Sequence, residues 1–89
     1  MSAIDELKLL MQNQPERVVI GSNRTLKLLK LSKVDKVYIA KNAPEDILND
    51  IKYYAKLANV EVIPLSLSNE ELGAILKKPF KVAVVSVLK

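Results

Sequence analysis

The residues best suited to ligand chemistry lie in a short polar segment that follows an apolar run. They are Gly21, Ser22, Asn23 and Arg24, with Lys27 one helical turn later. A glycine at this point permits a sharp turn into a helix, and the first N–H groups of a helix point toward a bound anion. The asparagine, arginine and lysine side chains add hydrogen-bond donors beside those N–H groups. The segment therefore predicts a site for phosphate groups.

A second candidate segment lies near the C-terminus, where one aromatic residue stands among cations. It reads Lys77, Lys78, Pro79, Phe80 and Lys81, and it holds the only phenylalanine in the chain. Ammonium groups pair with phosphates, whereas an aromatic ring stacks on an unpaired base. This combination favours nucleic acid with looped or single-stranded nucleotides as the ligand.

Each of these features also fits a plain structural role, and the residue types alone leave the choice open. Gly21 suits an ordinary strand-to-helix turn, and Lys27 and Lys30 suit a solvated helix face. Phenylalanine is by default a core residue, so Phe80 could be buried. Against burial, Phe80 lies between a proline and a lysine, outside the regular apolar run of the last predicted strand.

Charged residues are segregated along the chain, which has a formal net charge of +4. Residues 17–41 contain seven basic side chains and one acidic side chain, whereas residues 42–71 contain two basic and six acidic ones. Residues 72–89 contain four lysines and no acid. This segregation is typical of proteins that bind a polyanion, although solvated helix faces also produce it.

Composition argues against several classes of protein. The 89 residues include no cysteine and no histidine, which excludes thiolate or imidazole metal sites and Ser-His-Asp catalysis. The phosphate-binding glycine motifs of nucleotide enzymes are also absent. We therefore expect no enzymatic activity, no cofactor and no metal. No apolar run is long enough to span a bilayer, so we expect a cytoplasmic protein with no membrane partner.

The apolar pattern indicates the elements that must position these segments. Helices are predicted over about 3–12, 24–31, 45–58 and 69–76, and strands over about 17–20, 36–40, 61–64 and 82–88. Ser2 is predicted to cap the first helix, and Ser68 with Glu71 forms a capping box for the fourth. Alternating helices and strands predict an α/β fold in one domain, residues 1–89, with helices on both faces of a mostly parallel or mixed sheet.

Such a fold brings loops from distant parts of the chain together. The turns at residues 21–24, 42–44 and 77–80 are expected at the same end of the sheet. Ligands of open α/β sheets bind where strand-end loops converge. One continuous surface is therefore predicted from the glycine turn to the aromatic loop.

Five stretches of the chain, in order, resemble the kink-turn RNA-binding family, which includes ribosomal protein seven-Ae. They are residues 21–27, 37–42, 53–57, 69–73 and 80–88, and they include a Tyr-Tyr-Ala and a Glu-Leu-Gly tripeptide. Within that family the stretches are similar to the thirty-e branch, found in the large ribosomal subunit of archaea and eukaryotes. The resemblance implies a three-layer α-β-α sandwich with a four-stranded mixed sheet.

The resemblance also implies a function, namely structural binding of rRNA in the large subunit. The implied target is a kink-turn, a helix–internal loop–helix element with G·A pairs and a sharp bend. Such a bend opens the narrow groove that hides base edges in regular A-form RNA. Other ribosomal proteins are possible neighbours, and the free chain is expected to be a monomer. The alternative is a kink-turn-binding subunit of a small ribonucleoprotein that modifies or processes RNA.

Carried over onto this sequence, the resemblance and the predicted helix face give a set of candidate RNA-binding residues. They are Gly21, Ser22, Asn23, Arg24, Lys27, Lys30, Asn42, Ala43, Glu71, Leu72, Gly73, Lys78, Pro79 and Phe80. The sequence departs from the family at Lys77, where a glycine is usual. If that position needs a positive φ, the departure predicts an altered loop around Phe80.

Overall fold

The computed structural model describes residues 3–89 as helices that alternate with strands. The helices are α1 (Ala3–Asn13), α2 (Ser22–Lys30), α3 (Glu45–Ala58) and α4 (Asn69–Ile75). The strands are β1 (Val18–Ile20), β2 (Val34–Ile39), β3 (Glu61–Pro64) and β4 (Val84–Leu88), and a short 3₁₀ turn, η1 (Pro15–Arg17), precedes β1. The predicted order of elements is confirmed. The predicted helix cap at Ser2 lies outside the described residues.

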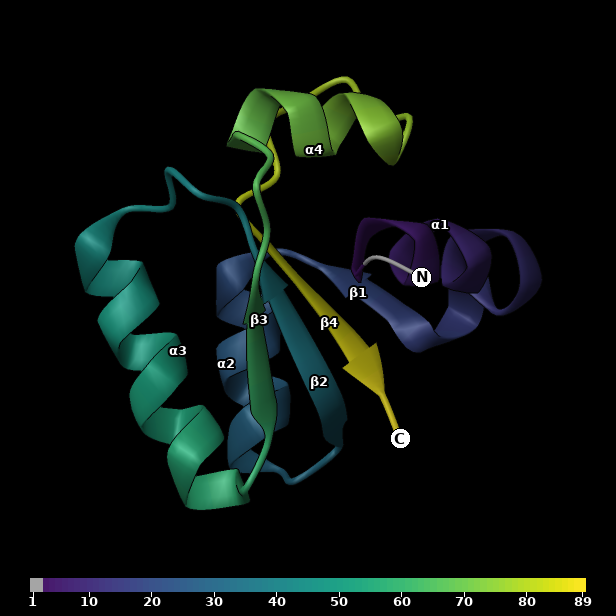
Figure 1. Cartoon of the computed structure of the whole chain (residues 1–89). Coiled ribbons are helices and arrows are strands. Elements are labelled where there is room, and N and C mark those ends of the chain that lie inside the picture. The colour runs from purple at the N-terminus through teal and green to yellow at the C-terminus, as the bar shows by residue number, and fades with distance from the viewer. Residues whose placement is uncertain (1–2) are drawn as a thin grey trace.

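The four strands form one mixed sheet in the order β1-β4-β2-β3. Strand β4 pairs antiparallel with both of its neighbours, whereas β2 and β3 run parallel. The last strand of the chain is therefore internal to the sheet, between the first and the second (Figure 1). Four of its five residues are buried, which explains its continuous apolar sequence.

Helices cover both faces of the sheet and enclose two apolar cores (Figure 1). The core under α1 and α4 includes Leu7, Tyr38, Leu72 and Val85. The core under α2 and α3 includes Leu29, Val37, Ile51 and Val84. Val37 and Tyr38, which are neighbours on β2, thus point into different cores, because side chains alternate between the two faces along a strand. The predicted three-layer α-β-α sandwich is confirmed. Within residues 3–89, no helix combines the length and apolar character needed to cross a bilayer.

Several element boundaries differ from the prediction by one or two residues, and two of these changes affect the candidate site. Strand β4 begins at Val84 and not at Val82, because the Val82 N–H donates to the carbonyl of Asn69 (3.0 Å) at the start of α4. Helix α2 begins at Ser22, two residues early, because Gly21 makes the turn alone. Residues 82–83, which precede β4, are therefore part of the loop that joins α4 to the sheet.

A buried polar contact holds the first turn of α2 on the sheet. The Thr25 hydroxyl donates to the Ser86 hydroxyl (3.0 Å), which in turn donates to the carbonyl of Val19 (3.4 Å). Thr25 and Ser86 are both fully buried. The contact joins α2, β4 and β1 just behind the glycine turn, and it fixes the direction in which the helix leaves the sheet.

We expect Thr25→Val to lower the free energy of unfolding by about 1–2 kcal/mol. Valine keeps the shape of threonine, but it removes the donor and leaves a buried hydroxyl with one partner fewer. Urea denaturation followed by circular dichroism measures the change. In the Thr25→Val background, Ser86→Ala should cost less than it does alone, and strictly additive costs would contradict the pair.

Candidate nucleic-acid interface

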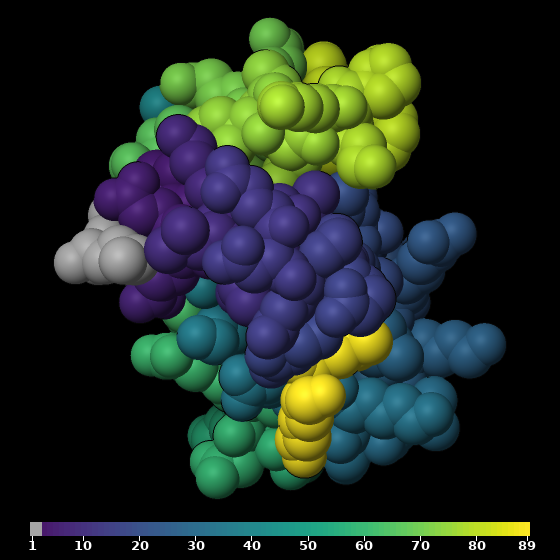
Figure 2. Space-filling model, turned by 90° about the vertical axis from the view of Figure 1, so that its right-hand side faces the viewer, coloured from purple at the N-terminus to yellow at the C-terminus, as the bar shows by residue number. Residues whose placement is uncertain are grey.

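A groove of about 690 Å³ at one end of the sheet joins the two candidate segments. Its walls are β1, the start of α2, and the loop that precedes β4. They include Gly21, Ser22 and Arg24 on one side and Lys78 and Phe80 on the other. Figure 2 shows the yellow-green chain after α4 at the same edge of the molecule as the blue side chains of the α2 segment. The structure thus brings the glycine turn and the aromatic loop to one surface.

Gly21 is required at its position by backbone conformation and not by lack of space. Its φ is 119°, which L side chains rarely adopt, and a Cβ built there would meet no atom within 4 Å. The Gly21 N–H donates to the Val84 carbonyl (3.0 Å), so the turn is tied to β4. Helix α2 then starts with no acidic residue in its first turn. The positive end of the helix dipole therefore faces the groove without a compensating carboxylate.

Phe80 is 56% exposed, so the alternative that it is a core residue is excluded. Phe80 borders the groove and also a shallower hollow of about 460 Å³ beside α4. The neighbouring Lys81 forms an ion pair with Glu70 (3.6 Å), and both side chains are well exposed. Such a surface pair contributes little stability, so Lys81 can exchange it for a phosphate at small cost.

The loop that carries Phe80 rests directly on the backbone of α4. A Cβ at Gly73 would collide with the carbonyl oxygen of Phe80, so only glycine permits this approach. The Lys78 N–H donates to the Gly73 carbonyl (2.9 Å). These contacts fix the loop on the helix, and they leave the Phe80 ring on the solvent side.

Lys77 takes the left-handed conformation that the sequence departure put in question, with φ 59°. The turn therefore keeps the shape that a glycine would adopt freely, although a side chain in this region costs conformational energy. The condition set for an altered loop, a positive φ at this position, is therefore met by a lysine.

Glu71 and Leu72 support the loop from behind and do not line the groove. The Glu71 carboxylate accepts the Ser68 N–H (3.1 Å), and the Ser68 hydroxyl accepts the Glu71 N–H (3.2 Å). These bonds, with a smaller contribution from Lys41, hold the pKa of Glu71 below its ordinary value. Leu72 is fully buried in the core under α4. Pro79 is exposed beside the shallow hollow.

Asn42 links the loop after β2 to the start of α4. Its side-chain oxygen accepts the Asn69 N–H (2.8 Å), and its amide nitrogen donates to the Asn69 side-chain oxygen (3.2 Å). The Asn69 carbonyl in turn accepts the Val82 N–H, as described above. Sequence reasoning missed Asn69 as a site residue, because its pairing with Asn42 joins two loops that are distant in the chain. Ala43 packs against the core under α2 and α3.

The exposed side of α2 divides between two surfaces. Asn23, Arg24 and Lys27 are exposed, and Arg24 borders the groove. Lys30, at the other end of the helix, has its ammonium 4.8 Å from the centre of the Tyr54 ring on α3. The structure does not bring Lys30 to the groove. Residues 3–89 also contain no group of three carboxylates that could hold a metal ion.

Fold and groove together define a three-layer α/β sandwich with a cationic, ring-bearing cleft at one end of its sheet. The sequence model of the ribosomal protein L7Ae/L30e/S12e/Gadd45 family matches residues 4–89. The chain belongs to this family.

Individual relatives agree with this membership. The chain is 44% identical over 72 residues to the large ribosomal subunit protein eL30 of Methanocaldococcus jannaschii, which covers 81% of the chain and 66% of the relative. It is 46% identical over 71 residues to eL30 of Methanopyrus kandleri, with 80% and 65% covered. The match thus spans just under two thirds of these relatives. A solved Giardia lamblia 15.5 kD RNA binding protein shares the fold, with a TM-score of 0.79 at 22% identity, over 100% of the chain and 77% of that protein.

We expect Gly73→Ala to lower the free energy of unfolding by about 1–3 kcal/mol. The added methyl group must displace the Phe80 carbonyl, and overpacking of this kind forces the backbone to shift. Thermal and urea unfolding measure the loss. Ala74→Ser, on the exposed side of the same helix, should change stability by less than about 0.5 kcal/mol. Equal stability of the two variants would show that the loop does not rest on α4.

We expect Lys77→Gly to raise the free energy of unfolding by up to about 1 kcal/mol. Glycine removes the cost of a left-handed side chain, and the greater entropy of the unfolded glycine cancels part of that gain. The midpoint of urea unfolding reports the change. The matched variant Lys78→Gly, at a position without a positive φ, should be destabilising. A loss of stability at Lys77→Gly would mean that the lysine side chain outweighs the strain.

Proposed function

We propose that this chain is a structural, RNA-binding component of the large ribosomal subunit, and that its groove binds a kink-turn in rRNA. The observation that supports this most directly is the convergence of Gly21 and Phe80 on one groove. The name of the archaeal relatives, large ribosomal subunit protein eL30, favours the ribosomal role over a small ribonucleoprotein. The role is structural, and it includes no enzymatic step.

The groove offers three kinds of contact that suit a sharply bent internal loop. The first N–H groups of α2, with Asn23 and Arg24, present donors to base edges where the bend opens the groove of the RNA. Lys27 and Lys78 pair with flanking phosphates, which fix the position of the RNA without reading its sequence. Phe80 stacks on a nucleotide that the bend has turned out of the helix.

Supporting residues hold these contacts in place before RNA arrives. Gly73 and Lys77 shape the loop, and the Asn42–Asn69 pair joins it to the loop after β2. A preorganised surface loses little conformational freedom on binding. The proposed complex therefore needs no rearrangement of the sheet or of α4.

The direct experiment is a fluorescence anisotropy titration with two RNA hairpins of equal length. One contains an internal loop with tandem G·A pairs, and the other is fully paired. The proposal expects tighter binding to the first at the same salt concentration, because only the kinked RNA exposes base edges. Equal affinity for both hairpins would leave only non-specific attraction between a basic protein and RNA.

We expect Phe80→Ala to weaken binding of the G·A hairpin by about 1–3 kcal/mol, the usual contribution of one stacked base. The ring is exposed, so its removal should leave the unfolding free energy nearly unchanged. Phe80→Tyr keeps an aromatic face and should retain most of the affinity. An unchanged dissociation constant for Phe80→Ala would place the ring outside the complex.

A further inference from the structure

A second surface, toward the C-terminal ends of α2 and α3, carries large apolar side chains that are exposed to solvent within residues 3–89. Leu31 is 54% exposed, Tyr53 62% and Leu57 68%. These are three of the five large apolar side chains exposed within residues 3–89, and a fourth is Phe80. Exposed apolar side chains that gather in one place usually mark an interaction surface.

A hollow of about 270 Å³ lies within this surface, between the two helix ends. We call it the tyrosine hollow, and it is lined by Leu29, Lys30, Ser32, Tyr54, Leu57 and Ala58. The Tyr53 ring meets the Tyr54 ring edge to face, with centroids 5.1 Å apart and planes at 86°. The Lys30 ammonium lies 4.8 Å from the centre of the Tyr54 ring. The two rings and the cation therefore form one continuous set of contacts.

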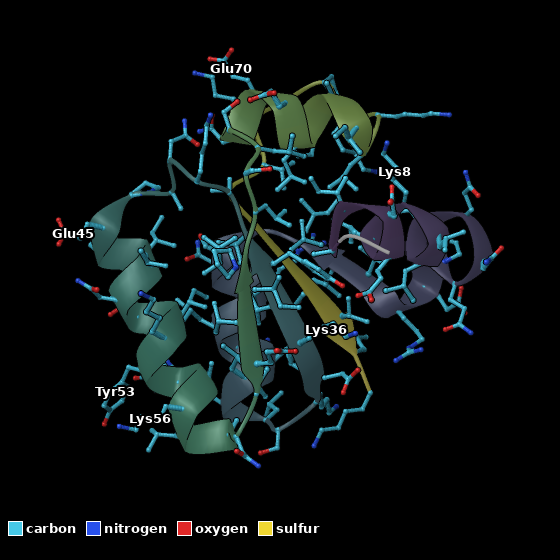
Figure 3. The ribbon with its side chains drawn as sticks, in the orientation of Figure 1. Lys8, Lys36, Glu45, Tyr53, Lys56 and Glu70 are labelled. Carbon is cyan, nitrogen blue, oxygen red and sulfur yellow. The ribbon has the colours of Figure 1, made fainter. Side chains whose placement is uncertain are left out.

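The charges around the tyrosine hollow favour an anionic partner. Lys30 lines the hollow, whereas Tyr53 and Lys56 lie outside its lining on α3; Figure 3 shows the labelled Tyr53 and Lys56 side chains projecting away from the sheet. Asp50 lies one helical turn before Tyr53 and is the acidic residue nearest to it along α3. The Tyr53–Tyr54 pair thus has two lysines near it, Lys30 over the Tyr54 ring and Lys56 one helical turn after Tyr53.

We propose that the tyrosine hollow, together with the exposed Tyr53 ring beside it, binds an unpaired nucleotide of RNA as a second contact separate from the groove. Tyr53 stacks on the base, Lys30 and Lys56 pair with the phosphates on either side of the nucleotide, and Leu57 covers the sugar. This inference rests on the proposed function only in taking RNA as the partner. The matching of rings to bases and of ammonium groups to phosphates favours RNA over an apolar protein segment.

The geometry of α2 allows both sites to be occupied at once. Arg24 borders the groove near the start of the helix, and Lys30 lines the hollow at its end. Lys30 is six positions after Arg24, a rise of about 9 Å along the helix. The RNA groups at the two sites therefore contact different ends of one rigid element.

The test uses the whole chain with its groove saturated by the G·A hairpin. A single-stranded decauridylate is then titrated in, and backbone amide signals are followed by NMR. The expected shifts fall at residues 30–32 and 53–58, whereas the signal of Phe80 responds to the hairpin alone. Tyr53→Ala should weaken decauridylate binding by about fivefold or more, the equivalent of one lost stack. Tyr53→Phe should bind as the wild type does, and Lys56→Ala should bind more weakly.

Two results would overturn the inference. One is a folded chain whose signals at residues 53–58 do not respond to decauridylate. The other is a response at those residues to an acidic, leucine-rich peptide but not to the RNA, which would assign the hollow to a protein partner. Failure of the groove proposal is seen separately, as loss of the Phe80 response to the hairpin.

Discussion

The position of the Phe80 ring in solvent depends on the close backbone contact between α4 and the loop that follows it. Burial of a phenylalanine side chain is worth about 1.5–3 kcal/mol, so an exposed ring must be held out by other interactions. Here Gly73 lets the Phe80 carbonyl approach the helix, and the Gly73 carbonyl accepts the Lys78 N–H. Val82 is bound to Asn69 on the far side of the loop. The proposed binding surface thus depends on these backbone contacts, which hold the loop with Phe80 facing outward.

Helix α2 connects the two surfaces proposed for RNA. Its start forms one wall of the groove, its end lines the tyrosine hollow, and its middle is fixed to the sheet by the Thr25–Ser86 pair. The helix carries three cations and no acid. The buried residues of α2 therefore set the direction of the helix, and its exposed residues give it a positively charged side.

The sequence was enough to predict the elements and the layers, because apolar periodicity and capping residues are local signals. It could not predict the strand order, which depends on β4 entering the sheet between β1 and β2. Residue types also could not decide whether Phe80 was buried, since the answer lies in a contact with Gly73. Lys30 was grouped with the groove because helical spacing shows a shared face, but spacing does not show that the side chain reaches Tyr54. Asn69 was missed for a similar reason, because its partner Asn42 is in another loop.

The internal position of β4 has a consequence for how the protein is made. Strand β1 pairs with β4 alone, Val18 with Val87, so the first strand has no sheet partner until the last one has been synthesised. Until β4 is added, β1 has no strand to pair with, and β2 has only β3. Long-range pairing of this kind is slow compared with helix formation. The Gly21 N–H at the groove is bonded to the Val84 carbonyl, so the glycine turn takes its final shape only when β4 enters the sheet. The groove is therefore complete only after translation has reached the C-terminal strand.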